Sequence, residues 1–303
     1  MKPPPFTYHA PVHLDDAVRL LAQAGGSGKV LAGGQSLVPL LNMRLAAPAH
    51  IIDINALPGL DTVRVDPGGV RVGALVRHSV LEGHAAAVSA IPLLRQGLRL
   101  VAHPVIRNRG TTVGSIAHAD PSAEMPAVLA LLGGEVEARG PAGVRTVAAA
   151  DFFTGPMETA LAADEIAVAV RFPRPAPGTG TAFAEVARRQ GDYAVCGVAA
   201  AVTLDADQRI SAARACYISV APVPLVVDLT EAVAGRAPGN LDTADAEALA
   251  ADRIRPEDDI HATASYRAHL ARVLTERALR DAGRAALNSL DPDSHPTAIR
   301  SER

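Results

Sequence analysis

The first part of the chain alternates between apolar runs and short polar or glycine-containing segments. In HLDDAVRLLAQA (13–24) the apolar residues recur at helical spacing, and two acidic residues stand in the first turn. The run GKVL (28–31) predicts a short buried strand that ends in a glycine turn. SLVPLLNMRL (36–45) predicts a short helix, and HIIDIN (50–55) predicts a second strand. We therefore expect an α/β lobe over about residues 1–55.

From about residue 60 the pattern changes. DTVRVDPGGVRVGAL (61–75) alternates valine with polar residues around a Pro-Gly-Gly turn and predicts a β-hairpin. The stretch 80–103 is mostly helical in pattern, whereas RNRGTTVGSIAHADP (107–121) predicts a glycine-containing loop that leads into a helix starting at Asp120. Apolar segments further on supply more strands. A second lobe is therefore expected over about residues 56–175.

The last part of the chain begins after a segment that is rich in proline and glycine. PRPAPGTGT (173–181) has the composition of a linker or long turn. After it, residues 194–220 predict two apolar strands joined by a turn at 205–208, and residues 258–287 predict an amphipathic helix. We expect a C-terminal domain over 176–288 and a disordered tail over 289–303.

Composition narrows the class of protein. The chain has 303 residues, of which 49% are hydrophobic and 20% are charged, so a normal core is expected. The net charge of −3, without a clustered basic region, argues against nucleic acid as a partner. No apolar run approaches the roughly 18 residues of a membrane helix, and the N-terminal residues do not resemble a secretion signal. We expect a cytoplasmic protein without membrane insertion.

Candidate metal chemistry is sparse. Cys196 and Cys216 are the only cysteines, too few for an iron–sulfur cluster or a cysteine zinc site, and both lie in apolar strands typical of a core. The ten histidines show no H-E-x-x-H spacing. The sequence therefore predicts neither a metal site nor catalytic residues that would activate an organic substrate.

Two loops of small residues, one in each lobe, carry the most informative chemistry. Such residues expose successive backbone N–H groups, which form a nest suited to phosphate. The predicted donors are Gly33, Gly34, Gln35 and Ser36 in the first loop, and Thr111, Thr112, Val113, Gly114 and Ser115 in the second. Together the loops suit a diphosphate that bridges two lobes, as in a dinucleotide cofactor, although each alone also fits a structural turn.

Other phosphate motifs do not occur. No Gly-Lys-Ser/Thr closes a P-loop, and no G-x-G-x-x-G follows an early strand, which disfavours ATP hydrolysis and a Rossmann domain. Arg107 and Arg109 precede the second loop. Their guanidinium groups would either pair with phosphate oxygens or remain solvated on the surface.

Long motifs around both loops resemble a known family. AGGQSLVPLLNMRL (32–45) and IRNRGTTVGSIAHADPSAEMPAVLALLG (106–133) are similar to the flavin-binding subunit of the molybdenum hydroxylases. This group includes the medium subunit of aerobic carbon monoxide dehydrogenase and the flavin domain of xanthine dehydrogenase. The similarity extends to ARRQGDYAVCGVAAAV (187–202) and YRAHLARVLTERAL (266–279). It implies an α+β fold: a two-lobed FAD-binding domain of the vanillyl-alcohol-oxidase (PCMH) type, then a small α/β C-terminal domain.

The resemblance also implies which residues contact FAD. The first loop would wrap the pyrophosphate, and the second would close on it from the other lobe. Glu124 stands where the family has an acidic residue near the ribityl or ribose hydroxyls, Tyr193 where it has an aromatic over the isoalloxazine, and Ile166 near an aliphatic position against the ring. The implied FAD-binding set is Ala32, Gly33, Gly34, Gln35, Ser36, Leu37, Thr111, Thr112, Val113, Gly114, Ser115, Glu124, Ile166 and Tyr193.

Two positions depart from the family pattern. Val113 stands where the second loop more commonly has a glycine, which would loosen that contact. Ala184 stands where xanthine dehydrogenases have a lysine, which puts a lysine contact to flavin or NAD in doubt.

Three functions follow from these observations. By resemblance, the chain would be an electron-transfer flavoprotein that works with a large molybdopterin-binding subunit and a small [2Fe–2S] subunit. This heterotrimer would itself be doubled, and FAD would pass electrons from the clusters to an external acceptor. A self-sufficient FAD-dependent reductase on the same fold is the alternative, and a nucleotide-binding module without catalysis is the third. The substrate and the terminal acceptor (NAD, quinone or dioxygen) are not encoded in this chain.

Overall fold

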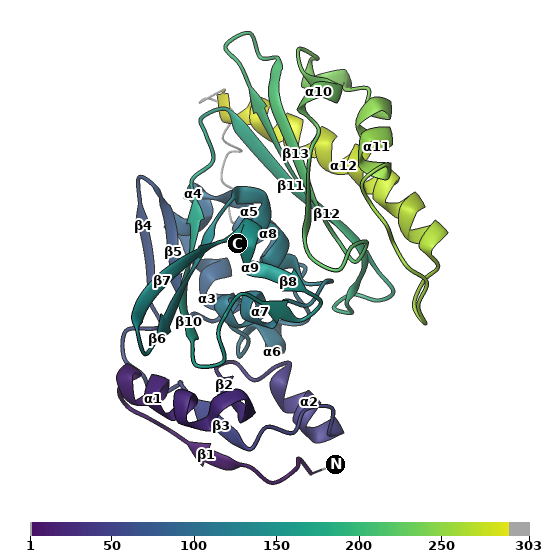
Figure 1. Cartoon of the computed structure of the whole chain (residues 1–303). Helices are drawn as coiled ribbons and strands as arrows, with labels where there is room; N and C mark the ends of the chain where they lie inside the picture. The colour runs from purple at the N-terminus through teal and green to yellow at the C-terminus, as the bar shows by residue number, and fades with distance from the viewer. Residues whose placement is uncertain (1, 291–303) are drawn as a thin grey trace, which may run out of the picture.

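The computed structural model describes residues 2–290 as three bodies arranged along one long axis. An N-terminal lobe lies at one end, a larger second lobe lies in the middle, and a sheet covered by a long helix lies at the other end (Figure 1). None of the helices in this part of the chain is both long and apolar enough to cross a membrane.

The N-terminal lobe, which we call lobe 1, is a three-stranded parallel sheet in the order β1-β3-β2. Its elements are β1 (Thr7–His9), α1 (Leu14–Ala24), η1 (Gly25–Ser27), β2 (Gly28–Leu31), α2 (Leu37–Met43) and β3 (His50–Asp53). The buried face of α1 consists of Ala17, Val18 and Leu21, which join the core that also contains Ile52. The helices and strands predicted from the apolar spacing of this region are confirmed.

The middle body, lobe 2, is built on a five-stranded antiparallel sheet in the order β4-β5-β10-β6-β7. Its strands are β4 (Val63–Asp66), β5 (Gly69–Gly73), β6 (Glu135–Gly140), β7 (Gly143–Ala148) and β10 (Ile166–Pro173), with a small sheet of β8 (Phe153–Gly155) and β9 (Glu158–Thr159). Its helices are α3 (His78–Gly83), α4 (Ala85–Ala90), α5 (Pro92–Leu98), α6 (Pro104–Arg107), α7 (Thr112–His118), α8 (Glu124–Leu132) and α9 (Ala149–Phe152). The predicted hairpin β4–β5 is confirmed.

Two sequence expectations in lobe 2 are wrong in detail. The segment predicted as a loop, 107–121, contains α7, because the Thr111 hydroxyl accepts a hydrogen bond from the Gly114 amide (3.1 Å) and so starts that helix. The next helix starts at Glu124 rather than at Asp120. The Asp120 carboxylate accepts the Ser122 amide (2.8 Å), which forms a turn in place of the first helical residues.

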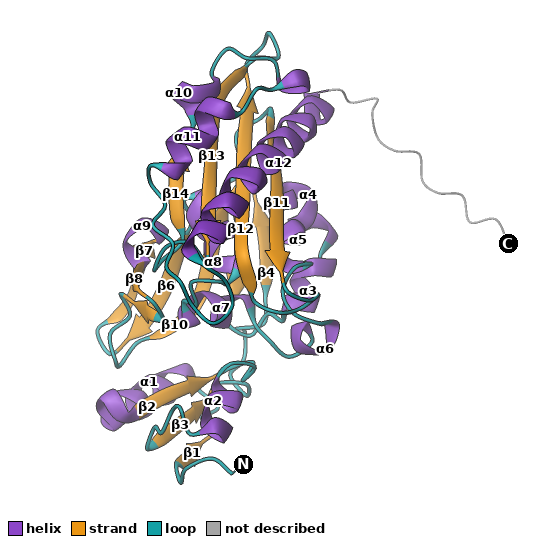
Figure 2. Cartoon of the chain, turned by 90° about the vertical axis from the view of Figure 1, so that its right-hand side faces the viewer, coloured by secondary structure: helices purple, strands orange, loops and turns teal. Residues whose placement is uncertain are grey.

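The third body is a four-stranded antiparallel sheet in the order β11-β12-β13-β14, with α12 lying along one face (Figure 2). Its elements are β11 (Thr179–Ala187), β12 (Ala194–Leu204), β13 (Ile210–Ile218), β14 (Leu225–Asp228), α10 (Thr230–Val233), η2 (Pro238–Asn240), α11 (Ala244–Ala251) and α12 (Ala264–Leu290). The hairpin predicted around 205–208 is confirmed as β12–β13.

Small residues explain how closely α12 packs on this sheet. Ala282 and Ala286 are fully buried, and a Cβ on Gly180 of β11 would overlap their backbone atoms. The helix predicted over 258–287 starts later, at Ala264, because the Asp259 carboxylate accepts the amides of His261 (2.8 Å) and Ala262 (3.0 Å) in a turn. It continues to Leu290, so the predicted tail, 289–303, lies almost wholly outside the described residues.

Candidate functional site

The first glycine loop connects β2 to α2 and presents a run of free amides. Within residues 2–290, the N–H groups of Gly33, Gly34, Gln35 and Ser36 donate to no protein acceptor. Gly34 has φ = 73°, a conformation that L side chains rarely adopt. The Gln35 side chain donates to the Gly33 carbonyl (3.2 Å), which holds the turn in shape. This loop can therefore accept an anion on successive backbone donors.

The second loop offers fewer donors than the sequence indicated. The Thr112 amide donates to the Val76 carbonyl (3.3 Å), the Gly114 amide to the Thr111 hydroxyl (3.1 Å) and the Ser115 amide to the Thr111 carbonyl (3.0 Å). In the described part of the chain, only the amides of Thr111 and Val113 in this loop have no protein acceptor. Most anion-binding donors are thus in lobe 1.

The two loops are in direct contact across the lobe boundary. A Cβ on Gly33 would lie 2.5 Å from the Arg109 carbonyl oxygen, 2.8 Å from the Gly110 Cα and 3.0 Å from the Thr111 nitrogen. Only glycine allows this approach. The free amides of the two lobes are therefore brought to one place, as a bridging diphosphate would require.

His78, at the start of α3, contacts the second loop through its backbone and its side chain. Its amide donates to the Gly110 carbonyl (2.9 Å), and its Nδ1 lies 3.3 Å from the Thr112 hydroxyl. Burial, and then the Arg107 charge, lower the pKa of His78 to about 4. The imidazole is therefore neutral at physiological pH and acts as a structural hydrogen-bonding group.

A pair of carboxyl groups lies where the third body meets lobe 2. Glu124 opens α8 and is only 8% exposed, and burial raises its pKa to about 7. Glu185 comes from β11, and its Oε2 is enclosed without a hydrogen-bond partner among the described residues. Burial, and then the Glu124 charge, raise the pKa of Glu185 to about 8. The pair is therefore able to hold protons near neutral pH.

The loop between β11 and β12 carries Tyr193, whose side chain is 68% exposed. The loop is seated on lobe 2: Gly191 has φ = 84°, and a Cβ there would lie 2.5 Å from the His103 ring. Loss of hydration, and then the charges of Asp120 and Glu124, raise the pKa of Tyr193. An exposed aromatic ring thus stands near Asp120 and the buried Glu124, outside the core.

The remaining predicted residues have varied surroundings. Ala32 and Leu37 flank the first loop and are half-buried. Val113 is 2% exposed in the lobe 2 core, so its side chain fills core space beneath the second loop. Ile166 is equally buried at the start of β10. Ala184 packs against the core of the third body.

The two arginines near the second loop have different environments. Arg107 donates to the Glu82 carboxylate (2.9 Å) and to the carbonyls of Val101 (2.9 Å) and Ala102 (3.2 Å), so its role is structural. The Arg109 side chain is exposed and has no protein partner in the part of the chain that the structure describes. Only Arg109 remains available to an anion.

Several residues at the site carried no signal that we recognised in the sequence. They are Asn55, two residues after β3, Arg77 and His78, a few residues after β5, and Glu185 in β11. A polar residue after a buried strand is a weak indication of a role at a sheet edge, and HIIDIN and ALVRH both have that form.

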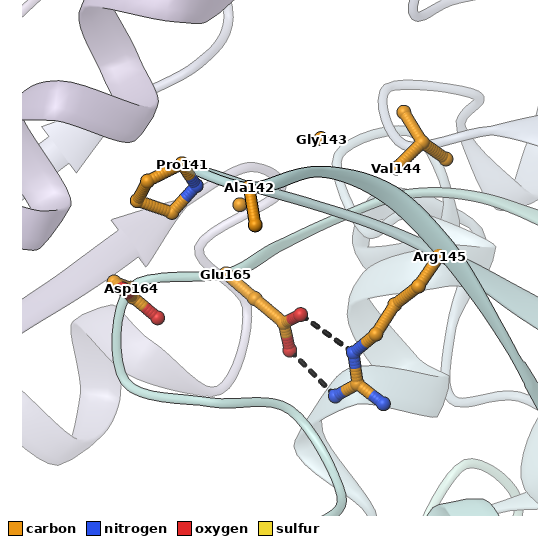
Figure 3. A pocket seen from close by; sticks show the side chains of 8 residues that line it. Pro141, Ala142, Gly143, Val144, Arg145, Asp164 and Glu165 are labelled. Atoms are coloured by element: carbon orange, nitrogen blue, oxygen red, sulfur yellow. Dashed lines mark hydrogen bonds and ion pairs between the residues drawn. The ribbon is translucent and has the colours of Figure 1, made fainter.

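Two surface hollows lie elsewhere. One, of about 220 Å³, lies beside the β6–β7 hairpin, where Arg145 makes paired hydrogen bonds to the Glu165 carboxylate (2.6 and 2.7 Å; Figure 3). The other, of about 630 Å³, lies along β14 and α10. Neither is lined by any residue predicted to contact FAD.

Comparison with known protein families decides the class. Residues 4–175 match the family described as the FAD binding domain in molybdopterin dehydrogenase. Residues 181–298 match the CO dehydrogenase flavoprotein C-terminal domain. The chain belongs to the FAD-binding subunits of the molybdenum hydroxylases. The resemblance inferred from the two glycine loops is thereby confirmed, as are FAD as cofactor and the membership in oxidoreductase complexes.

Relatives of this flavoprotein match it over nearly its whole length. It is 38% identical to the 6-hydroxypseudooxynicotine dehydrogenase complex subunit alpha of Paenarthrobacter nicotinovorans. The alignment covers 93% of this chain and 96% of the relative. It is 37% identical to the carbon monoxide dehydrogenase medium chain of Hydrogenophaga pseudoflava. That alignment covers 93% of this chain and 98% of the relative.

Solved structures agree on the fold of this flavoprotein. Carbon monoxide dehydrogenase from Hydrogenophaga pseudoflava aligns with a TM-score of 0.88 at 36% identity, over 95% of this chain and 99% of that one. Quinoline 2-oxidoreductase from Pseudomonas putida 86 aligns with a TM-score of 0.87 at 36% identity, over 95% and 100%. The predicted FAD-binding domain followed by a C-terminal domain is confirmed.

Proposed function

We propose that this flavoprotein is the electron-transfer subunit of a heterotrimer, with a large molybdopterin-binding subunit and a small [2Fe–2S] subunit as partners. Bound FAD supplies the exchange of electrons between the clusters and an external acceptor. Relatives that match over almost the whole chain are named as a medium chain or as one subunit of a dehydrogenase complex, which supports this reading. The reduced state of both cysteines in the described structure is compatible with a cytoplasmic complex.

The observation that carries the proposal is the contact between the two loops at Gly33. It joins the free amides of lobe 1 to those of Thr111 and Val113, and this donor set fits the diphosphate of FAD. The exposed Arg109 side chain adds a positive charge beside the loops. We assign the diphosphate to Ala32–Leu37 and Thr111–Ser115.

The flavin ring and its chain are assigned to the other end of the site. Tyr193 offers an exposed aromatic face, and Glu124 and Glu185 offer carboxyl groups that hold protons near neutral pH. These residues would cover the ring and bind its polar edge or the ribityl hydroxyls. Ile166, which is buried in the lobe 2 core, would contribute through the shape of the wall behind the ring.

One experiment separates the subunit from a self-sufficient enzyme. The full chain is expressed alone and together with its genomic neighbours, and candidate substrates are assayed with an artificial electron acceptor. We expect the chain alone to carry FAD but to oxidise no organic substrate, and the assembled complex to turn over. Robust substrate oxidation or reduction by the chain alone would instead establish the reductase alternative.

A further inference from the structure

The two glycine loops belong to different lobes, so the contacts between the lobes set the distance between the loops. Gly33 explains why they can approach, but a glycine contact is purely steric and does not set an angle or a distance. The loops are joined by hydrogen bonds at a second point. That link consists of two side chains, Asn55 from lobe 1 and Arg77 from lobe 2.

Asn55 is held rigidly by its own lobe. Its Nδ2 donates to the Ala32 carbonyl (2.9 Å) at the start of the first loop and to the Asp53 carboxylate (2.6 Å). The same carboxylate also accepts hydrogen bonds from the backbone N–H of Asn55 (2.9 Å) and from the Tyr8 hydroxyl (2.6 Å). Because both protons of Nδ2 point to acceptors in lobe 1, the orientation of the side-chain amide group is determined. Its Oδ1 therefore faces away from lobe 1.

Arg77 completes the link from the other side. Its Nη2 donates to Asn55 Oδ1 (2.6 Å), and its Nη1 donates to the Arg109 carbonyl (2.6 Å) at the start of the second loop. The backbone of Arg77 pairs with Thr111 in an antiparallel bridge, so the residue is anchored where the second loop begins. A guanidinium is a planar fork, and two bonds from its terminal nitrogens fix both distance and angle.

The link also concentrates positive charge between the loops. Burial, and then the charge of the nearby Arg109, lower the pKa of Arg77. Asp53 offsets part of that charge. An anion between the loops would relieve the repulsion, so the same pair of arginines that costs energy in the protein alone favours a diphosphate.

We propose that Arg77 is a positioning residue for FAD, which acts through Asn55 and the Arg109 carbonyl to hold the two glycine loops at the separation that the diphosphate needs. This inference rests on the proposed assignment of the diphosphate to the loops. Arg77 acts on the loops through their carbonyl groups, so its effect does not depend on a contact with the cofactor.

The test uses the full chain, stripped of FAD and titrated with FAD while flavin fluorescence is followed. Arg77→Gln keeps a polar side chain but cannot reach both acceptors, so we expect its Kd for FAD to rise by about tenfold or more. Arg77→Lys can make one of the two bonds, so its Kd for FAD should lie between those of Arg77→Gln and the unsubstituted chain. Because the link joins the two lobes, both variants should also lower the thermal midpoint of the stripped protein, so the Kd for FAD is the measurement that decides.

Arg145→Gln is the matched control. Arg145 also bonds a polar side chain, Glu165, and a backbone carbonyl, that of Ala160 (2.7 Å), but none of its contacts involves the glycine loops (Figure 3). We expect Arg145→Gln to lower the thermal midpoint without changing the Kd for FAD. If Arg77→Gln behaved in that same way, Arg77 would be a structural residue only and the inference would be wrong.

A double-mutant cycle tests the relay. If Arg77 acts in part through Asn55, then Asn55→Ser should weaken FAD binding, and Asn55→Ser combined with Arg77→Gln should weaken it hardly more than Arg77→Gln alone. Additive effects would contradict the relay. Failure of the unsubstituted chain to bind FAD would overturn the proposed function itself, whereas unchanged FAD affinity in Arg77→Gln would overturn only this inference.

Discussion

Gly33 and Arg109, which lie in different lobes, are in backbone contact: a Cβ on Gly33 would stand 2.5 Å from the carbonyl oxygen of Arg109. Real Cβ atoms do not approach a backbone oxygen so closely, and neither partner is the flexible end of a side chain. Any residue larger than glycine must therefore push the lobes apart.

This contact makes Gly33→Ala the most direct test of the loop junction. One added methyl group should separate the loops, weaken FAD binding by about tenfold or more and lower the free energy of unfolding by about 1–3 kcal/mol. FAD content after purification, FAD titration and thermal melts measure the two effects. Gly26→Ala is the control, because a Cβ at Gly26 in the same lobe meets nothing within 4 Å. Full FAD content in Gly33→Ala would rule out a functional junction.

Tyr193 offers a test at the other end of the site. Because its side chain is 68% exposed, Tyr193→Ala should change the free energy of unfolding by no more than about 0.5 kcal/mol. If the ring covers the flavin, the absorbance spectrum and the reduction potential of bound FAD should change. Tyr266→Ala, which removes another exposed tyrosine, should leave both unaltered. A lowered stability with an unchanged flavin spectrum would show that Tyr193 is structural.

Most of the fold follows from local sequence patterns. The hairpins β4–β5 and β12–β13 were predictable because alternating valines or paired apolar runs flank a turn. The errors occurred where a polar side chain competes with the helix pattern. Thr111 starts α7 inside a supposed loop, and Asp259 delays the start of α12. Such competition depends on the orientation of one side chain, which periodicity does not encode.

The site was predictable only in part. Runs of small residues indicated where free amides would occur, and in the first loop they do occur at Gly33–Ser36. Asn55, Arg77 and Glu185 were missed because each acts on a partner from a distant part of the chain. Arg77 meets Asn55 and the Arg109 carbonyl only after the lobes have come together. An isolated polar residue carries no local sign of such a contact.

The neutral state of His78 predicts a loss of stability in acid. The unfolded histidine binds a proton below about pH 6.5, whereas the buried one binds it only near pH 4. Between these values the unfolded state holds more protons, so His78 contributes a fall of about 3 kcal/mol in the free energy of unfolding as the pH falls. Because Glu124 and Glu185 contribute with the opposite sign over part of this range, the effect is measured as the difference between denaturant titrations of the FAD-free chain and of its His78→Gln variant. His78→Gln should be less stable at pH 7, but its free energy of unfolding should fall less as the pH is lowered. An equally steep fall in the variant would show that His78 is not the group that binds the proton.

The carboxyl pair contributes a slope of the opposite sign over an overlapping range of pH. Unfolded Glu124 and Glu185 lose their protons near pH 4.5, but in the folded chain burial keeps them protonated to about pH 7 and 8. The folded state therefore holds more protons between these values. Their contribution to the free energy of unfolding of the FAD-free chain should fall as the pH rises from about 5 to 8, at roughly 1.4 kcal/mol per pH unit for each proton involved, and level off above pH 8. Below about pH 6.5 the contribution of His78 offsets part of this decline.

Glu185→Gln should reduce the slope of the free energy of unfolding against pH by more than the roughly 1.4 kcal/mol per pH unit that one proton contributes. It removes the group with the more strongly raised pKa, and it also removes a negative charge beside Glu124. Glu165→Gln is the control, because Arg145 lowers the pKa of Glu165 in the folded state and the ordinary pKa of an unfolded glutamate, 4.5, already lies below the window. It should reduce stability at every pH without changing the slope. If Glu185→Gln left the decline between pH 5 and 8 intact, Glu185 would not be a proton-holding group, and its role beside Glu124 would have to be sought in hydrogen bonding alone.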